Sequence, residues 1–125
     1  METIEEQIIK GGEFIIKKTK CDEVFTPEDF SDEQKMMRDA VKDFTDKEIW
    51  SKKHEFENHN YQLTADVMKK AGNLGFLGVN VPEEYGGLGM PFTSSMLVCD
   101  YISGSSGSTS TAFGAHTGIG TMPIL

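Results

Sequence analysis

The chain has 125 residues and a formal net charge of −8, from 12 Lys and Arg against 20 Asp and Glu. This length is that of one domain, and a chain of this size can bury enough surface to fold without a disulfide or a metal ion. The acidic balance argues against a nucleic-acid partner, whose phosphates require Lys and Arg, and against an anionic membrane surface.

The charge is divided unevenly along the chain. Residues 1–60 hold 26 of the charged side chains, whereas residues 61–125 hold only 6. A globular domain rarely leaves its second half so bare. We therefore expect a solvated first half and a second half that another part or partner covers.

Cys21 and Cys99 lie far apart in the sequence and form no Cys-x-x-Cys motif, so the sequence predicts two inert thiols and no zinc site. The first residues lack the basic and apolar regions of a secretory signal. No apolar stretch approaches the ~20 residues that a membrane span requires. We therefore expect a cytoplasmic protein with no membrane span.

Residues 1–25 are expected to form an irregular arm, because Gly11-Gly12 interrupts any helix there. Within the arm, Phe14-Ile15-Ile16 could pair as a short strand or lie as a hydrophobic strap. The remaining residues, 26–125, are expected to form one all-α domain, a helical bundle.

A first amphipathic helix is predicted over residues 31–50. Ser31 and Gln34 have the spacing of a capping box at its start. One buried face is predicted from apolar residues at i, i+3, i+4 and i+7, which are Met37, Ala40, Val41 and Phe44. The polar stretch 52–60 follows and is predicted to be a solvated loop or frayed helix end. Its two histidines, His54 and His59, are not expected to bind metal.

A second helix is predicted over about residues 62–74. Four apolar residues would share its buried side, namely Leu63, Val67, Ala71 and Leu74. Gly75 follows at the position where a helix commonly ends on a residue with positive φ.

The last 40 residues contain 8 Gly, 7 Ser and 5 Thr, a composition typical of a flexible linker. Apolar residues spread through the segment argue against a linker and favour helices near 93–105 and 107–116. The second of these would be weak in isolation, because Gly, Ser and Thr are poor helix formers. Small residues on a helix permit close approach of a second helix, a sheet or a ligand.

The residues alone predict no catalytic machinery. Gly114, Gly118 and Gly120 follow no expected strand, so they do not match a dinucleotide-binding motif. Ser105 and Ser106 do not match the Gly-x-Ser-x-Gly motif. His116 is more typical of a packing residue than of a general base.

The order of the segments, however, resembles a known family. Residues 70–89, KAGNLGFLGVNVPEEYGGLG, closely resemble a segment of the acyl-CoA dehydrogenases that lies in their N-terminal helical domain. Residues 30–34 are similar to the start of that domain's first helix, and residues 113–120 to a segment of the very-long-chain branch. The resemblance covers about residues 26–125, and residues 11–14 of the arm are similar to an extension in that branch.

This resemblance implies a parent flavoenzyme that oxidises fatty acyl-CoA thioesters and passes electrons to an electron-transferring flavoprotein. In the family, FAD is held mainly by a middle β-domain and a C-terminal helical domain, and the catalytic glutamate is C-terminal. The chain resembles the first domain only. We therefore expect a fragment of a homo-oligomeric enzyme that binds no FAD alone, binds no metal and is inactive alone.

The resemblance also implies a substrate site, since the family's acyl chain lies between helices of its N- and C-terminal domains. At the positions of Ser110 and Gly114, medium-chain members carry larger polar residues that close the cavity. Small residues there imply a long acyl chain, although Ser110 departs from the glycine-like pattern of the long-chain branch. The predicted acyl-chain residues are Ser110, Phe113, Gly114, Thr117 and Gly118. The alternative is a free-standing helical module whose uncharged half binds a partner protein.

Overall fold

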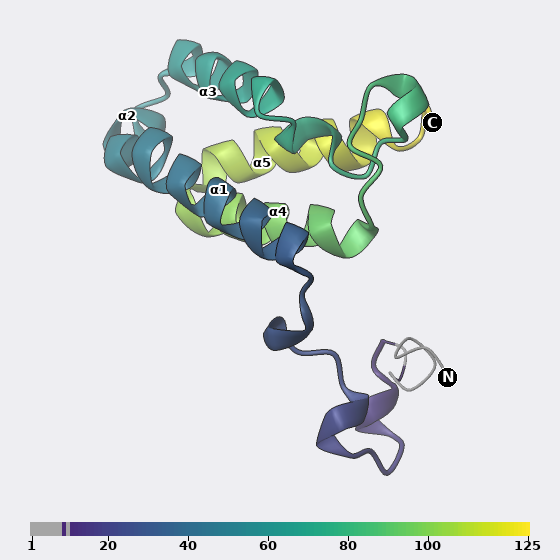
Figure 1. Ribbon diagram of the computed structural model, residues 1–125. Helices are drawn as coiled ribbons and strands as arrows, with labels where there is room; N and C mark the ends of the chain where they lie inside the picture. The colour runs from purple at the N-terminus through teal and green to yellow at the C-terminus, as the bar shows by residue number, and fades with distance from the viewer. Residues whose placement is uncertain (1–8, 10) are drawn as a thin grey trace. The chain divides into compact units, whose positions relative to one another are not determined.

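The computed structural model describes residues 9 and 11–125, which Figure 1 draws in colour. The chain forms two compact units, Met1–Glu33 and Gln34–Leu125, which we describe separately. The described residues form helices and turns and no β-strand, which confirms the predicted all-α fold. Within that part of the chain, no helix has the length and apolar character needed to cross a membrane.

The first unit is built from short 3₁₀ turns, Glu13–Ile15, Cys21–Glu23 and Pro27–Asp29. The short strand considered for Phe14-Ile15-Ile16 is therefore wrong. The N–H groups of Ile15 and Ile16 donate to the carbonyl oxygens of Gly12 and Glu13, each at 3.0 Å. These local bonds use the backbone groups that a strand would need for pairing.

Helix α1, Asp32–Glu48, confirms the first predicted helix. Its buried residues are Val41, Phe44 and Thr45, whereas Ala40 is exposed, so the prediction for Ala40 is wrong. The buried stripe runs along one side of Ala40, which leaves that small side chain at the border with solvent.

A short helix, α2, spans Lys53–Glu57, where we expected a loop or frayed end. The prediction failed because Phe56 inserts into the core, with only 2% of its surface exposed. One buried aromatic side chain thus fixes a stretch whose other residues are polar. The next helix, α3 (Tyr61–Asn73), begins at Asn60, whose side-chain oxygen accepts the Leu63 N–H at 3.1 Å.

Helix α3 buries Val67 and Ala71 as predicted, but Leu74 is 56% exposed, so its assignment to the buried side is wrong. Gly75 ends the helix with a φ of 81°, which confirms its predicted role. The positive φ turns the chain sharply, so Leu74 stays outside while Phe76 enters the core with 3% exposure.

Residues 76–90 fold back on themselves as a compact loop. The Leu88 N–H donates to the Gly78 carbonyl oxygen and the Met90 N–H to that of Val79, both at 2.9 Å. Gly87 lies so close to Val81 that a Cβ atom on it would overlap the Val81 backbone and side chain. Glycine is therefore required at position 87 for steric reasons.

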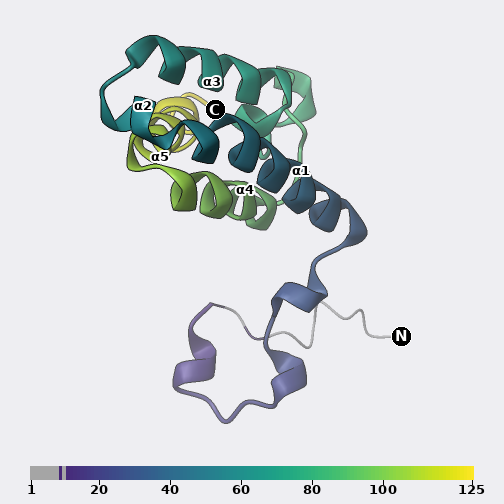
Figure 2. The ribbon, with the colours of Figure 1, turned by 90° about the vertical axis from the view of Figure 1, so that its left-hand side faces the viewer.

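Helices α4 (Phe92–Ser105) and α5 (Gly107–Gly114) confirm the two helices predicted in the small-residue segment. A π-helical turn, Ala115–Thr121, continues from α5. Helix α5 packs against α4 and also contacts α3 and α2, and Figures 1 and 2 show it in the interior of this unit.

The core of the second unit draws on all of these elements. Phe44 of α1 and Phe76 meet edge to face, with ring centroids 5.5 Å apart. The buried hydrophobic cluster consists of Val41, Phe44, Ile49, Phe56, Val67, Ala71, Phe76, Val79, Val98, Ile102 and Phe113. It joins α1, α2 and α3 to α4 and α5.

Replacing Gly87 by alanine tests the tight contact in the 76–90 loop. We expect G87A to lower the free energy of unfolding by about 1–3 kcal/mol, because the new methyl group forces the Val81 backbone to move. Urea unfolding measures the change. As a control, G104A adds a methyl group where none of the described residues has an atom within 4 Å. It should raise the stability by about 0.5–1 kcal/mol, because alanine favours a helix interior. Equal stability of G87A and the parent chain would contradict the steric reading.

Candidate functional site

The residues predicted to contact an acyl chain lie on α5 and the π-helical turn. Ser110, Gly114 and Thr117 are half-buried and Gly118 is exposed. Their spacing of three to four residues places them along one side of a helix. Phe113 points away from them, because its ring is 2% exposed and belongs to the core cluster. We call the set Ser110, Gly114, Thr117 and Gly118 the small-residue strip.

The strip is open along its length. A Cβ atom built on Gly114 or Gly118 would have no atom of the described residues within 4 Å outside its own stretch of helix. Packing inside the described structure therefore does not explain why these positions are glycine. Their smallness leaves room on the outer side of α5 for something else.

The hydroxyl groups of the strip are already satisfied. The Ser110 hydroxyl donates to the Ser103 Oγ of α4 at 3.0 Å. The Thr117 hydroxyl donates to the Phe113 carbonyl oxygen at 2.9 Å. Because these polar atoms bond within the protein, the strip can face an apolar ligand without leaving a donor unpaired.

The π-helical turn is a feature that the sequence analysis missed. The Thr121 hydroxyl donates to the carbonyl oxygen of His116, five residues earlier, at 2.8 Å. A Cβ atom on Gly120 would lie 2.9 Å from the Ala115 carbonyl oxygen, so a side chain there would disturb the turn. The closely spaced Gly118 and Gly120 are the only sequence signal that pointed to an unusual helix.

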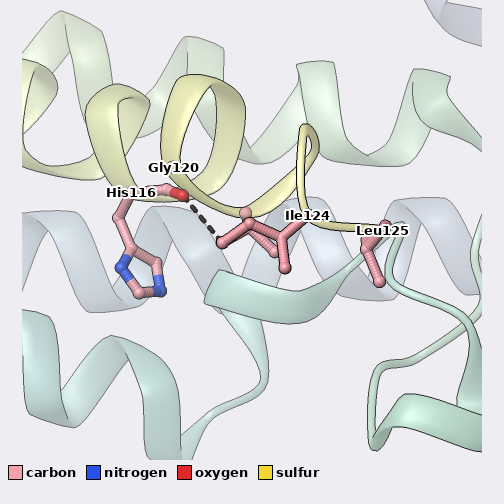
Figure 3. A pocket seen from close by; sticks show the side chains of 5 residues that line it. His116, Gly120, Ile124 and Leu125 are labelled. Carbon is pink, nitrogen blue, oxygen red and sulfur yellow. Dashed lines mark hydrogen bonds between the residues drawn. The ribbon is translucent and has the colours of Figure 1, made fainter.

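The same turn borders a depression of about 360 Å³, shown in Figure 3. Its lining is mostly apolar and consists of His116, Gly120, Thr121, Ile124 and Leu125. His116 contributes its exposed imidazole at one side. The wide turn and the two C-terminal residues therefore form a second apolar surface after the strip.

A separate groove lies between α1 and α3, which sequence analysis also missed. Two adjoining depressions of about 250 and 350 Å³ share Phe44, Glu48 and Leu74. Charged residues line both, with Lys70 in the first and Asp43 and Lys47 in the second. The groove thus combines an exposed leucine with a charged rim.

Glu48 ties the two helices of this groove together. Its Oε2 accepts the Lys52 ammonium at 2.8 Å and the Lys70 ammonium of α3 at 2.7 Å. These two hydrogen bonds hold the pKa of the Glu48 carboxyl below its ordinary value. The ionised form of Glu48 is therefore favoured in the folded protein.

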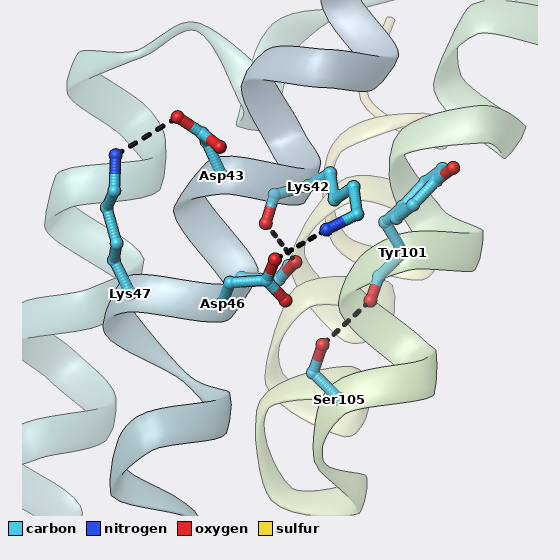
Figure 4. Close-up of polar contacts among 7 residues, drawn as sticks. Lys42, Asp43, Asp46, Lys47, Tyr101 and Ser105 are labelled. Atoms are coloured by element: carbon cyan, nitrogen blue, oxygen red, sulfur yellow. Dashed lines mark hydrogen bonds and ion pairs between the residues drawn. The ribbon is translucent and has the colours of Figure 1, made fainter.

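Helix α1 carries two further ion pairs between residues one helical turn apart, and Figure 4 shows Lys42 and Asp46 on the side that faces α4 and Lys47 and Asp43 on the other side. Lys42 pairs with Asp46 at 2.6 Å and Lys47 with Asp43 at 3.0 Å. The hydrogen bond to the Asp46 carboxylate raises the pKa of Lys42. Exposed pairs of this kind add little to the stability of a helix, because solvent screens them.

The described residues contain no group of three or more His, Cys, Asp or Glu side chains that could hold a metal ion. The two histidines of the 52–60 stretch lie at the surface. The side chain of His54 is 97% exposed and its Nδ1 is 3.7 Å from Glu57. His59 stacks on Tyr61, with ring centroids 6.0 Å apart.

Comparisons with known proteins agree on one family. Residues 31–125 match the family model of the acyl-CoA dehydrogenase N-terminal domain. The "Probable acyl-CoA dehydrogenase" of Bacillus subtilis (strain 168) is 44% identical over 116 residues, which cover 93% of this chain and 19% of that protein. The mitochondrial isovaleryl-CoA dehydrogenase of Solanum tuberosum is 35% identical over 91 residues, covering 72% of this chain and 22% of the relative.

A solved structure matches as well. It is an acyl-CoA dehydrogenase from Bacillus anthracis complexed with FAD, with a TM-score of 0.80 and 43% identity. The match covers 92% of this chain and 20% of that one. The present chain thus spans about a fifth of the length of these relatives.

The role of Glu48 can be tested through its pH dependence. We expect E48Q to lower the free energy of unfolding by about 0.5–1 kcal/mol at pH 7, a modest value because solvent still screens the partly exposed pairs. The lowered pKa means that the contribution is complete above the ordinary value of 4.5 and is lost as the pH falls through the folded-state pKa. Urea unfolding at several pH values measures the gap between E48Q and the parent chain, which should close in acid.

The matched control is D43N, which removes an exposed pair on the same helix. It should change the stability by no more than about 0.5 kcal/mol. A gap for E48Q that stays constant into acid would show that the ionised carboxylate is not what joins α1 to α3.

Proposed function

The chain belongs to the acyl-CoA dehydrogenase family, and we propose that it serves as the N-terminal domain of an FAD-dependent enzyme that introduces the α,β double bond into fatty acyl-CoA thioesters. The observation that carries this proposal is the family match over residues 31–125. The structural match to an FAD-complexed dehydrogenase supports it. The proposal covers residues 26–125 as the domain, with residues 1–25 as its arm.

FAD itself would be held outside these residues. Gly114, Gly118 and Gly120 lie inside α5 and the π-helical turn, so they do not form the loop between strand and helix that receives a pyrophosphate. These three glycines therefore do not form a dinucleotide-binding loop. We propose that this chain alone neither binds FAD nor oxidises a substrate, and that its part in the reaction is to shape the acyl-chain site.

The small-residue strip supports a long acyl chain as the substrate. Ser110, Gly114, Thr117 and Gly118 leave the outer side of α5 open, and their hydroxyl groups are bonded within the protein. Phe113 packs in the core beneath them and anchors α5 to the rest of the unit. Burying an acyl chain stabilises the complex by about 0.8 kcal/mol for each methylene, so an unobstructed strip favours longer substrates.

An electron-transferring flavoprotein is the proposed acceptor, and the groove between α1 and α3 is its proposed docking site. Leu74 is 56% exposed and lines the groove together with Phe44 and with the charged residues Lys47, Glu48 and Lys70. An apolar anchor surrounded by polar residues is the usual arrangement of an energetically important contact between proteins. We further propose that the whole enzyme is a homo-oligomer, that it acts in fatty-acid β-oxidation and that it is cytoplasmic.

The chain-length proposal is tested by placing a carboxylate on the strip. In the longer enzyme, G114E should lower the ratio of kcat/KM for a 16-carbon over an 8-carbon acyl-CoA by at least tenfold, because each excluded methylene loses about 0.8 kcal/mol. A dye-reduction assay with the two substrates measures the ratio. G104E on α4 is the control, since its position is also open. An unchanged ratio in G114E would overturn the chain-length proposal, and a parent enzyme that oxidises neither substrate would overturn the function.

The docking proposal is tested by removing the exposed leucine. L74S should lower kcat/KM for the electron-transferring flavoprotein at least tenfold while leaving activity with a small soluble dye unchanged, because only the protein acceptor needs the groove. Steady-state assays with each acceptor measure both values. Y61S is the matched control, because Tyr61 lies on the same helix and is 77% exposed outside the groove. Equal losses with both acceptors would contradict a docking role.

A further inference from the structure

Residue 9 and residues 11–23 of the first unit belong to a loop whose two ends are joined. The Ile9 N–H donates to the Glu23 carbonyl oxygen at 2.9 Å, which joins the two ends. At the Glu23 end, its carboxylate accepts the Lys20 N–H at 3.0 Å. The 3₁₀ turn Glu13–Ile15 shapes the distal part. Such compact loops with joined ends often carry function.

The distal part of this loop holds three consecutive apolar side chains in solvent. Phe14 is 51% exposed, Ile15 74% and Ile16 83%. The local backbone bonds fix this turn, so all three side chains project from a short, defined segment. A contiguous exposed apolar group on a bonded turn is typical of an interaction surface.

The residues that follow the apolar group are cationic. Lys17, Lys18 and Lys20 come directly after Ile16, and no acidic residue lies between positions 14 and 21. Glu13 is paired with the Lys17 ammonium at 2.8 Å. The other acidic residues of the loop, Asp22 and Glu23, lie at its closing end. The apolar tip and the positive charge therefore occupy the same part of the loop.

We propose that this loop tip binds the surface of an anionic lipid bilayer. Phe14, Ile15 and Ile16 would enter the boundary between headgroups and acyl chains, while the lysines contact lipid phosphates. The net charge of the whole chain argues against such a surface, but the charge nearest the bilayer decides, since charges more than about 8 Å away are largely screened at physiological ionic strength. This binding is independent of the proposed function.

Vesicle co-sedimentation of the full chain tests the proposal. Vesicles of phosphatidylcholine alone are compared with vesicles containing 30% phosphatidylglycerol, at about 0.05 M and 0.5 M salt. We expect binding that requires the anionic lipid and weakens at high salt. The triple variant F14S/I15S/I16S should bind at least tenfold more weakly. K17Q/K18Q/K20Q should lose the dependence on anionic lipid, at about fivefold in affinity for each of Lys18 and Lys20 and less for Lys17, which is paired with Glu13.

Matched controls separate the loop from general surface changes. K47Q/K53Q/K69Q removes the same charge from the second unit, and M36S removes a side chain that is 73% exposed on α1. Both should bind vesicles as the parent chain does, and circular dichroism confirms that all variants fold. Absence of binding by the parent chain would overturn the proposal, as would equal binding by the loop variants. Lipid-free self-association that disappears in F14S/I15S/I16S would identify the tip as a protein interface and also overturn it.

Discussion

The packing of the short helix α5 is the constraint on which the second unit depends. Thr109 and Phe113 face inward with 1% and 2% exposure, and the Thr109 hydroxyl bonds the Ser106 carbonyl oxygen at 3.1 Å. Eight residues rich in Gly, Ser and Thr do not form a stable helix in water. Contacts with α4, α3 and α2 therefore hold α5 in place. The candidate acyl-chain surface is on the other side of this same helix. The packing of α5 into the core therefore fixes the position of that surface.

Periodicity in the sequence predicted the long elements because one stripe of side chains meets the core in each. Helices α1 and α3 follow this rule within a few residues. The periodicity gave wrong predictions where one buried side chain or one backbone turn decides which residues enter the core. Phe56 turns a polar stretch into α2, and the positive φ of Gly75 sends Phe76 inward while Leu74 remains outside. Neither outcome is encoded in the spacing of neighbouring residues.

The candidate sites likewise divide into features that could be named from the sequence and features that form only on folding. The residues of the small-residue strip were named from the family resemblance, and their contact with an acyl chain stays a prediction. They lie on α5 and the π-helical turn, whereas Phe113, named with them, is in the core. The groove between α1 and α3 could not be predicted, because Glu48 and Lys70 are 22 positions apart and meet only after folding. The π-helical turn likewise brings the Thr121 hydroxyl to the carbonyl oxygen of His116, a contact that ordinary helical periodicity does not imply.

The uneven charge of the sequence corresponds to two different surfaces, the groove between α1 and α3 and the small-residue strip. The charged first half supplies the ion pairs of α1 and most of the rim of the groove, where electrostatics favours fast and selective encounters between proteins. The second half has few charges, and there the strip on α5 keeps its hydroxyl groups bonded internally. A charge near that strip would lose hydration whenever an acyl chain covered it. The small number of charges in residues 61–125 is compatible with the acyl-chain surface proposed for α5.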